Sequence, residues 1–293
     1  MCDETTELEN REYLLKRREF GKLGLTAGLS VVAGMASLIP HSANAMTVTE
    51  SDVDVTMENG ISDCYFVRPS TGKHPAILMW PDIRGLRPAY KAMGKRLAEV
   101  GYSVLVVNQF YRDAKAPVVG TNASFSDPDT RAYLIGMARK LNESNAISDA
   151  KAYISFLDQQ DSVDTTRKMG TAGYCMGGPL IMRTAAAVPS RVGAAASFHG
   201  GGMATDKEDS PHFLIPKSPA QVLHAIAEND DTKNPQMKDI LSAAYEAAGV
   251  PAEITVYKDT LHGWCALDSA VYNETQAEHA WARMLALFEK TLT

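Results

Sequence analysis

Residues 173–177 read Gly-Tyr-Cys-Met-Gly, a spacing that places one cysteine between two glycines. The residues before them, 168–172, could close a buried strand, and residues 178–187 after them have the composition of a helix. Glycines two residues before and after a nucleophile permit the strained strand-to-helix turn that exposes its side chain. We therefore interpret Cys175 as a candidate nucleophile, with a cysteine packed in the core as the alternative.

A catalytic thiol needs a base, because only a small fraction of a free thiol is thiolate at neutral pH. Residues 221–227 predict a strand that ends before Asp230 and Asp231, and residues 253–257 predict another strand before His262. Nucleophile, acid and histidine follow each other in this order in α/β-hydrolases, after successive strands. His262 would take the thiol proton, and one of the two aspartates would hold its imidazole.

Acyl-transfer chemistry also needs donors for the developing oxyanion. The backbone N–H of Met176, at the start of the predicted helix, is one candidate, and the N–H of Ile83, after an earlier strand, is the second. Residues 199–202 read His-Gly-Gly-Gly and resemble the donor loop of lipases, but they follow the nucleophile. We interpret them as a turn near the site, and His224, inside a predicted strand, as a core histidine.

Several segments together resemble the dienelactone hydrolase family, and the resemblance covers the chain from about Val53 to its end. It implies an α/β-hydrolase fold and cofactor-free opening of a lactone or related ester. It also implies a triad of Cys175, Asp230 and His262, and therefore favours Asp230 over Asp231 as the acid. The segments that carry the resemblance are 173–178, 227–230, 262–264, 272–273 and 280–283.

Some positions differ from the pattern of that family. Its best-known members have a glutamate that contacts the resting thiol, where this chain has the shorter Asp82. They also bind a substrate carboxylate with two arginines. Arg112 could be one of them, but Ala266 stands where the second is expected. Tyr111 and Trp264 are further candidates for binding substrate, with core packing as the alternative for Trp264. The resemblance thus predicts the reaction type and leaves the substrate open.

Alternating strands and helices predict the elements that must position these residues. Short apolar runs are typical of strands buried on both faces, and helical spacing separates them. The fold class is therefore α/β, with a mostly parallel, doubly wound sheet and helices on both faces. An antiparallel hairpin is expected near residues 53–67. Predicted strands cover residues 76–80, 103–107 and 192–198, and predicted helices cover 89–100, 146–159, 234–248 and 275–291. We interpret the long connection 113–145 as a cap or a surface excursion, with a helix near 131–141.

The N-terminal 45 residues have the pattern of a twin-arginine export signal. Arg17 and Arg18 precede a mildly apolar stretch, 23–39, and small residues mark a cleavage site after Ala45. A membrane anchor is the alternative, but seventeen residues that include three glycines are marginal for a span. We expect export of the folded protein by the twin-arginine machinery to a periplasmic or secreted location. Residues 46–293 would form one α/β-hydrolase domain.

Composition limits the partners of that domain. Residues 46–293 carry 24 Lys and Arg against 29 Asp and Glu, and this mild acidity argues against nucleic acid or an anionic membrane. No His or carboxylate pair has the spacing of metal ligands, and no cofactor is expected. Cys64 and Cys265 could pair in an oxidising compartment or remain separate thiols.

Three functions remain open from the sequence. The first is a cysteine-dependent hydrolase that opens a small lactone or ester through an acyl-thioester. The second is a non-catalytic protein of the same fold that binds a small ligand or a partner. The third is an acyltransferase, if the pocket excludes water. The substrate and the oligomeric state do not follow from the sequence.

Overall fold

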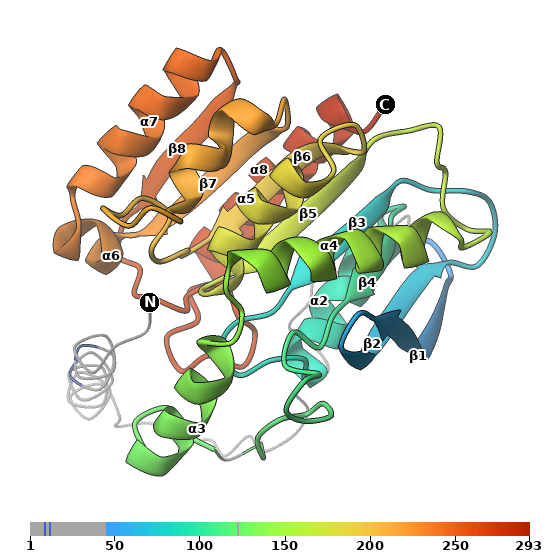
Figure 1. Cartoon of the computed structure of the whole chain (residues 1–293), viewed down its shortest axis with the longest axis horizontal. Helices are drawn as coiled ribbons and strands as arrows, with labels where there is room; N and C mark the ends of the chain where they lie inside the picture. The colour runs from blue at the N-terminus through green and yellow to red at the C-terminus, as the bar shows by residue number, and fades with distance from the viewer. Residues whose placement is uncertain (1–8, 10–11, 13–44, 122) are drawn as a thin grey trace, which may run out of the picture.

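A computed structural model of the chain describes residues 9, 12, 45–121 and 123–293 (Figure 1). The two arginines and the apolar stretch of the predicted export signal lie outside these residues. The described part is built on an eight-stranded sheet of order β1-β2-β4-β3-β5-β6-β7-β8. The strands are β1 (Val48–Met57), β2 (Gly60–Pro69), β3 (Ala76–Trp80), β4 (Ser103–Val106), β5 (Met169–Tyr174), β6 (Val192–Phe198), β7 (Gln221–Ala227) and β8 (Ala252–Tyr257).

Strand direction confirms the predicted architecture. β2 pairs antiparallel with both β1 and β4, while the strands from β4 to β8 pair in parallel. The predicted hairpin near the start is therefore the β1–β2 pair. Parallel neighbours need crossover helices, and these cover both faces of the sheet (Figure 1). The helices are α2 (Pro88–Glu99), α3 (Pro128–Ala138), α4 (Glu143–Asp158), α5 (Gly177–Ala187), α6 (Glu228–Lys233), α7 (Gln236–Ala248) and α8 (Glu274–Thr291), with a 3₁₀ turn at Pro211–Lys217.

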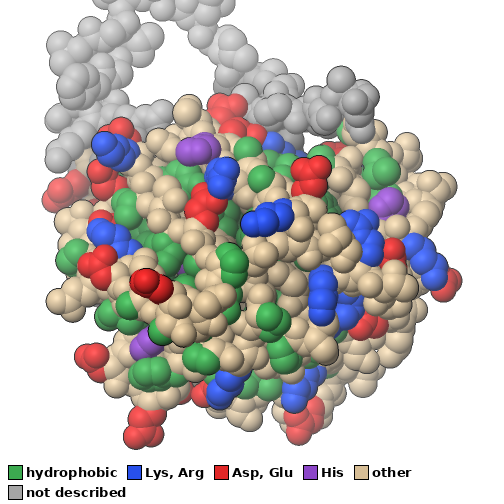
Figure 2. All heavy atoms as spheres, turned by 90° about the horizontal axis from the view of Figure 1, so that it is seen from above, with side chains coloured by type: hydrophobic (Ala, Val, Ile, Leu, Met, Phe, Trp, Pro, Cys, Tyr) green, Lys and Arg blue, Asp and Glu red, His purple; other side chains and the backbone are tan. Residues whose placement is uncertain are grey.

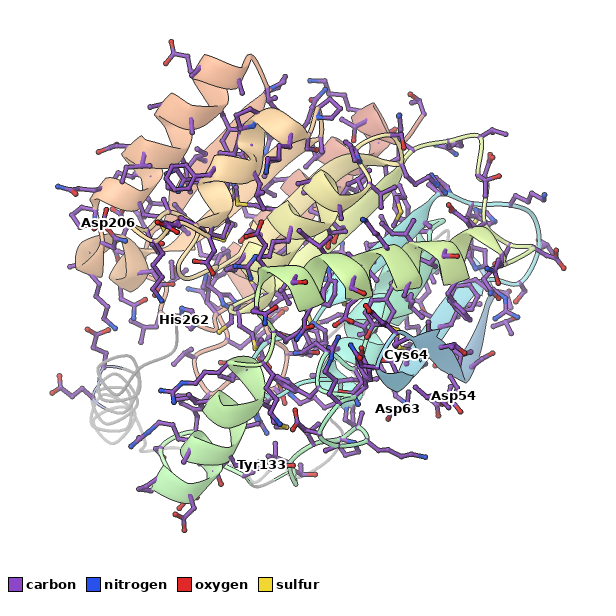
Figure 3. All side chains as sticks on the ribbon, in the orientation of Figure 1. Asp54, Asp63, Cys64, Tyr133, Asp206 and His262 are labelled. Carbon is purple, nitrogen blue, oxygen red and sulfur yellow. The ribbon has the colours of Figure 1, made fainter. Side chains whose placement is uncertain are left out.

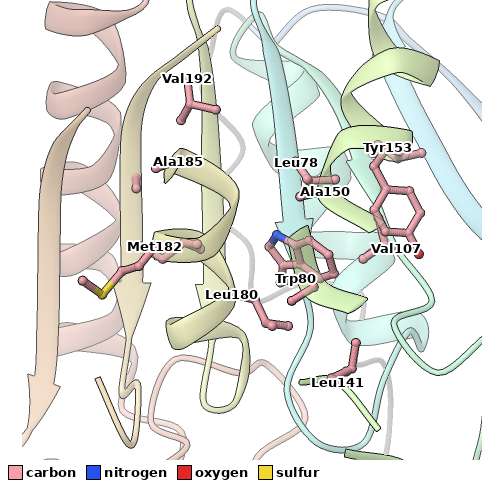
Figure 4. Close-up of a cluster of buried hydrophobic side chains, with 14 of the residues drawn as sticks. Leu78, Trp80, Val107, Leu141, Ala150, Tyr153, Leu180, Met182, Ala185 and Val192 are labelled. Carbon is pink, nitrogen blue, oxygen red and sulfur yellow. The ribbon is translucent and has the colours of Figure 1, made fainter. Parts of the chain in front are cut away.

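The central strand β3 shows why the core has two halves. Its side chains alternate, so that Leu78 and Trp80 belong to the buried cluster that also contains side chains of α4, α5 and α7. Ile77 and Met79 belong to the cluster that contains side chains of α2 and α8. The indole N–H of Trp80 donates to Thr184 Oγ1 over 3.0 Å, which satisfies its buried polar atom. Figure 4 shows Leu78 and Trp80 on β3, with Tyr153 of α4 beside them. Burial on both faces explains why β3 is continuously apolar.

The connection 113–145 contains one helix of its own and the start of another. α3 begins after Asp127, whose carboxylate accepts a hydrogen bond from the N–H of Thr130. α4 begins after Asn142, whose side chain accepts from the N–H of Asn145. Such caps stabilise helix starts, and each fixes where its helix begins. In Figure 3, α3 and His262 lie toward the same end of the sheet.

The described surface and helices give two further findings. On the face drawn in Figure 2, basic and acidic side chains are interspersed rather than gathered into one patch. None of the helices in the described ranges has the length and apolar character that crossing a bilayer requires. In the same residues, no group of three His, Cys, Asp or Glu side chains is arranged to hold a metal ion.

Candidate active site

Cys175 lies on a tight turn between β5 and α5, with a backbone φ of 55°. That value belongs to the left-handed region, which a residue with a side chain rarely adopts without strain. Glycine is required at both flanking positions, because a Cβ there would clash with the neighbouring backbone. A Cβ on Gly173 would lie 2.1 Å from the carbonyl oxygen of Gly177, and one on Gly177 would lie 2.5 Å from that of Trp80. The structure therefore forms the strand-to-helix turn that the spacing predicts.

His262 is the group that faces the thiol. It lies in the loop after β8 and is 4% exposed, while Cys175 is 2% exposed. Burial lowers the pKa of His262, but the charges of Cys175 and Asp230 and hydrogen bonds to both raise it to about 10. The imidazole therefore favours its protonated form when the thiol is ionised.

Asp230 holds the other side of the imidazole. Nδ1 of His262 lies 3.0 and 2.8 Å from the two carboxylate oxygens of Asp230, in the first turn of α6. Burial raises the pKa of Asp230, but the charge of His262 and its hydrogen bond have the larger combined effect and hold that pKa below its ordinary value. Asp231 instead binds Nζ of Lys238 at 2.7 Å. Of the two candidate acids, the structure brings Asp230 to His262.

The residues just before Asp230 fix the loop that carries the histidine. The side-chain oxygen of Asn229 accepts the backbone N–H of His262 over 2.8 Å. The carboxylate of Glu228 accepts the N–H of Asp259 over 2.9 Å, and its own N–H donates to Thr260 Oγ1. The segment at the end of β7 therefore orients both the imidazole and its backbone.

The two predicted oxyanion donors, the N–H groups of Met176 and Ile83, follow neighbouring strands of the sheet. Met176 precedes α5, and Ile83, 5% exposed, follows β3, the strand paired with β5. Their role as donors to an oxyanion remains a prediction.

Asp82 does not have the role expected of it as a contact of the resting thiol. Its carboxylate accepts two hydrogen bonds from Arg87, at 2.6 and 2.8 Å, and a third from the N–H of Arg84. Arg87 also binds both oxygens of Asp268, at 2.7 and 2.9 Å, and is only 7% exposed. Its planar guanidinium can bind two carboxylates at once. The loop after β3 is thereby tied to the loop after β8.

Arg112 and Tyr111 are used inside the fold, which corrects their prediction as substrate-binding groups. Both terminal nitrogens of Arg112 donate to Asp149 of α4 at 2.7 Å, and the hydroxyl of Tyr111 donates to the same carboxylate at 2.9 Å. Asp149 is 1% exposed. A carboxylate in this position has to be paired, and both predicted residues serve that need.

Trp264 belongs to the core rather than to a pocket wall. It is fully buried, and its ring lies 4.8 Å from that of Tyr257. The alternative of core packing is therefore correct. Cys64 and Cys265 are both buried and free, in β2 and in the loop after β8, so the alternative of separate thiols holds for the described structure.

Two groups near Cys175 were missed or underestimated from the sequence. His199 was interpreted as part of a turn, yet its ring lies 4.9 Å from that of His262. Its φ is 41°, and the preceding Phe198 accepts the N–H of Cys175. Tyr90 of α2 packs on Tyr174, with 5.3 Å between the rings. A positive φ in a non-glycine residue could not be predicted from sequence, because local turn signals do not reveal it.

The fold and the strained cysteine turn define the class of this protein, an α/β-hydrolase. The chain belongs to the dienelactone hydrolase family, whose family model matches residues 62–292. It is therefore a hydrolase of the lactone and ester type. The catalytic cysteine itself does not follow from membership, and it enters below as a proposal.

Individual relatives agree with this assignment. A carboxymethylenebutenolidase of Rhodococcus opacus is 28% identical over 233 residues, covering 76% of this chain and 84% of the relative. A crystal structure from Klebsiella pneumoniae, provisionally described as a dienelactone hydrolase, superposes with a TM-score of 0.72 at 23% identity, over 83% of this chain and 99% of that chain. The dienelactone hydrolase-like promiscuous phosphotriesterase P91, from metagenomic libraries, gives 0.69 at 21%, over 84% and 99%. Both structural likenesses show the fold alone.

Proposed function

We propose that this chain opens a small lactone or ester with Cys175 as its nucleophile, through an acyl-thioester. The observation that carries the proposal is the position of His262, between the carboxylate of Asp230 and the thiol of Cys175. A base, its orienting acid and a strained nucleophile are the parts that acyl transfer requires.

The first half of the reaction forms the thioester. The Cys175 thiolate attacks the carbonyl carbon, and the N–H groups of Met176 and Ile83 stabilise the oxyanion. The tetrahedral intermediate collapses as the carbon–oxygen bond breaks, and the His262 imidazolium gives its proton to the departing alkoxide. In a lactone that alcohol remains attached to the acyl group.

The second half consumes water. Neutral His262 takes a proton from a water molecule, and the hydroxide attacks the thioester carbonyl. The carbon–sulfur bond then breaks, and the thiolate is restored beside the imidazolium. A lactone gives one product with a carboxyl group and a hydroxyl, and an open-chain ester gives an acid and an alcohol, which balances one ester and one water. The acid then releases its proton to solvent as the carboxylate. An amine or alcohol in place of water would give acyl transfer, which we test by adding such acceptors.

A pair of experiments tests the nucleophile. Replacing Cys175 with Ala should abolish ester turnover while leaving the melting temperature nearly unchanged, because the side chain lost is small. Iodoacetamide should label the native thiol rapidly at neutral pH, with mass spectrometry locating the label on Cys175. Cys64 and Cys265 should react slowly, because burial raises the pKa of both thiols well above the ordinary value. Undiminished turnover in the Ala variant would refute the mechanism, and a sluggish thiol would favour a non-catalytic binder.

For location, we propose export through the twin-arginine pathway with cleavage after Ala45. Support comes from the sequence of the first 45 residues, with its two arginines, weak apolar stretch and small-residue site. A fusion of these residues to a folded reporter should reach the periplasm. Changing Arg17 and Arg18 to Lys should stop it, and export of that variant would contradict the proposal.

A further inference from the structure

Two buried side chains near the nucleophile have polar atoms that no residue of the described structure satisfies. The hydroxyl of Tyr90 and both ring nitrogens of His199 have no hydrogen-bond partner there, although the two residues are 0% and 1% exposed. Unpaired buried polar atoms are costly, and their presence in a site points to a ligand that completes them. His199 contacts His262, and Tyr90 packs on the residue before Cys175.

Both groups are uncharged hydrogen-bonding partners. Burial and the charge of His262 lower the pKa of His199 to about 4, despite the nearby thiolate and carboxylates. Burial and the charge of Asp82 raise the pKa of Tyr90 well above its ordinary value. At neutral pH the imidazole therefore offers one donor and one acceptor, and the phenol offers a hydroxyl.

The arginines around the site are already neutralised. Arg87 binds Asp82 and Asp268, and Arg84 lies 3.3 Å from Asp268. Arg112 is held by Asp149, and position 266 is alanine. None of these arginines therefore has its charge uncompensated. A substrate carboxylate would have to displace an internal acid to bind one of them.

The summed charge also opposes an anion. The charges that act on Tyr90, His199 or His262 are those of Arg87, protonated His262, Asp82, Asp230 and, in the proposed mechanism, the Cys175 thiolate. Among these groups the negative charges outnumber the positive ones by one. A further carboxylate would be desolvated beside this excess and would gain only the neutral donors of Tyr90 and His199, without a cation of its own.

We infer that the site selects small esters or lactones whose polar substituents are uncharged, and that Tyr90 and His199 bind these substituents by hydrogen bonds. The inference rests on the proposed hydrolysis and adds the class of substrate. The resemblance to the dienelactone hydrolase family instead implies a substrate carboxylate that two arginines bind. A neutral carbonyl, hydroxyl or amide group satisfies both side chains without disturbing the paired charges.

The first test compares two esters that differ in one charge. 4-Nitrophenyl hydrogen adipate ends in a carboxylate, and methyl 4-nitrophenyl adipate ends in a neutral ester. After correction for uncatalysed hydrolysis, kcat/KM for the neutral ester should exceed that for the acid at least about tenfold. Equal or faster Cys175-dependent turnover of the acid overturns the inference alone. Absence of turnover with either ester, and with 4-nitrophenyl butyrate, refutes the proposed hydrolysis as well.

The second test addresses the two side chains. Tyr90→Phe and His199→Phe should each lower the ratio of kcat/KM for the methyl adipate ester to that for 4-nitrophenyl butyrate by about fivefold, mainly through KM, as expected for one hydrogen bond. His199→Asn retains polar atoms and should preserve more of the ratio. Tyr133→Phe, on the exposed side of α3, is the matched control and should leave it unchanged. An unchanged ratio in both Phe variants overturns the assignment of these residues.

Discussion

At the scale of single residues, His262 is defined by the two negative groups that face it. The carboxylate of Asp230 holds Nδ1, and the sulfur of Cys175 lies close enough to raise the pKa of the imidazole when the thiol is ionised. On the proposed mechanism, the charged imidazole in turn stabilises the Cys175 thiolate, which should then persist at pH values where a free thiol is protonated. We expect the rate of iodoacetamide labelling at Cys175 to change little between pH 6 and pH 8. A rate that falls with acid across this range, as for a free thiol, would contradict the ion pair.

A change at Asp230 tests the acid. Replacing Asp230 with Asn removes the charge that orients the imidazole, and kcat should fall by about 10³–10⁴, as in other triads that lose this group. Asp231→Asn is the matched control, because Asp231 binds Lys238 rather than His262. Its kcat should stay within about twofold of the parent. Steady-state rates with 4-nitrophenyl butyrate check both variants, and equal losses in the two would contradict the assignment.

At the scale of elements, the turn that carries Cys175 depends on the absence of side chains. In Gly173→Ala, the new Cβ would meet the carbonyl of Gly177 at 2.1 Å, so the free energy of unfolding should fall by about 1–3 kcal/mol or more. Gly136→Ala is the matched control, because its Cβ would meet nothing within 4 Å in α3. That change should stabilise by about 0.5–1 kcal/mol, since Ala favours a helix. Urea denaturation measures both.

Arg87 joins the loop after β3 to the loop after β8 through its ion pairs with Asp82 and Asp268, which we call the Arg87 clamp. In Arg87→Met, Asp82 and Asp268 lose their shared partner, and unfolding should become easier by about 3–5 kcal/mol, as for other broken buried pairs. Arg283→Met, which removes an exposed pair with Glu253, should change stability by less than about 1 kcal/mol. Guanidinium chloride is unsuitable because it screens charge, so the comparison uses urea. Similar small effects in both variants would show that the clamp contributes little.

How far the sequence could predict these elements depends on the kind of signal. Apolar runs and helical spacing predicted the strands and most helices, with β3, β6 and β7 at their observed bounds. The order of nucleophile, acid and histidine predicted which loops would meet. The partners of Asp82, Arg112 and Tyr111 could not be predicted, because ion pairs between distant segments leave no local pattern.

At the scale of the whole molecule, two buried histidines link stability to pH. Burial lowers the pKa of His199 to about 4 and that of His224 to about 3. The unfolded chain binds their protons near pH 6.5 while the folded chain does not, so stability falls as the pH drops below 6.5. Between pH 6.5 and pH 5, each histidine should remove about 2 kcal/mol. Urea denaturation at pH 7 and pH 5 measures the sum.

His262 and Asp230 offset little of this loss. The pKa of His262 is raised, so its contribution is complete below pH 6.5 and is lost only as the pH rises through about 10. The pKa of Asp230 is lowered, so its contribution is lost only as the pH falls below 3.8. His224→Gln should therefore reduce the difference between pH 7 and pH 5 by about half. An unchanged difference would contradict the assignment of His224.

The shared carboxylates of Arg87 also bear on how specificity could evolve. Asp268 is the partly exposed member of the clamp, and one nucleotide change can turn an aspartate codon into one for asparagine or alanine. Either change would leave one edge of a buried guanidinium without its acid, facing the loop that carries the histidine. A lineage with this fold could in this way acquire affinity for acidic metabolites in one mutational step, and lose it again by reversion.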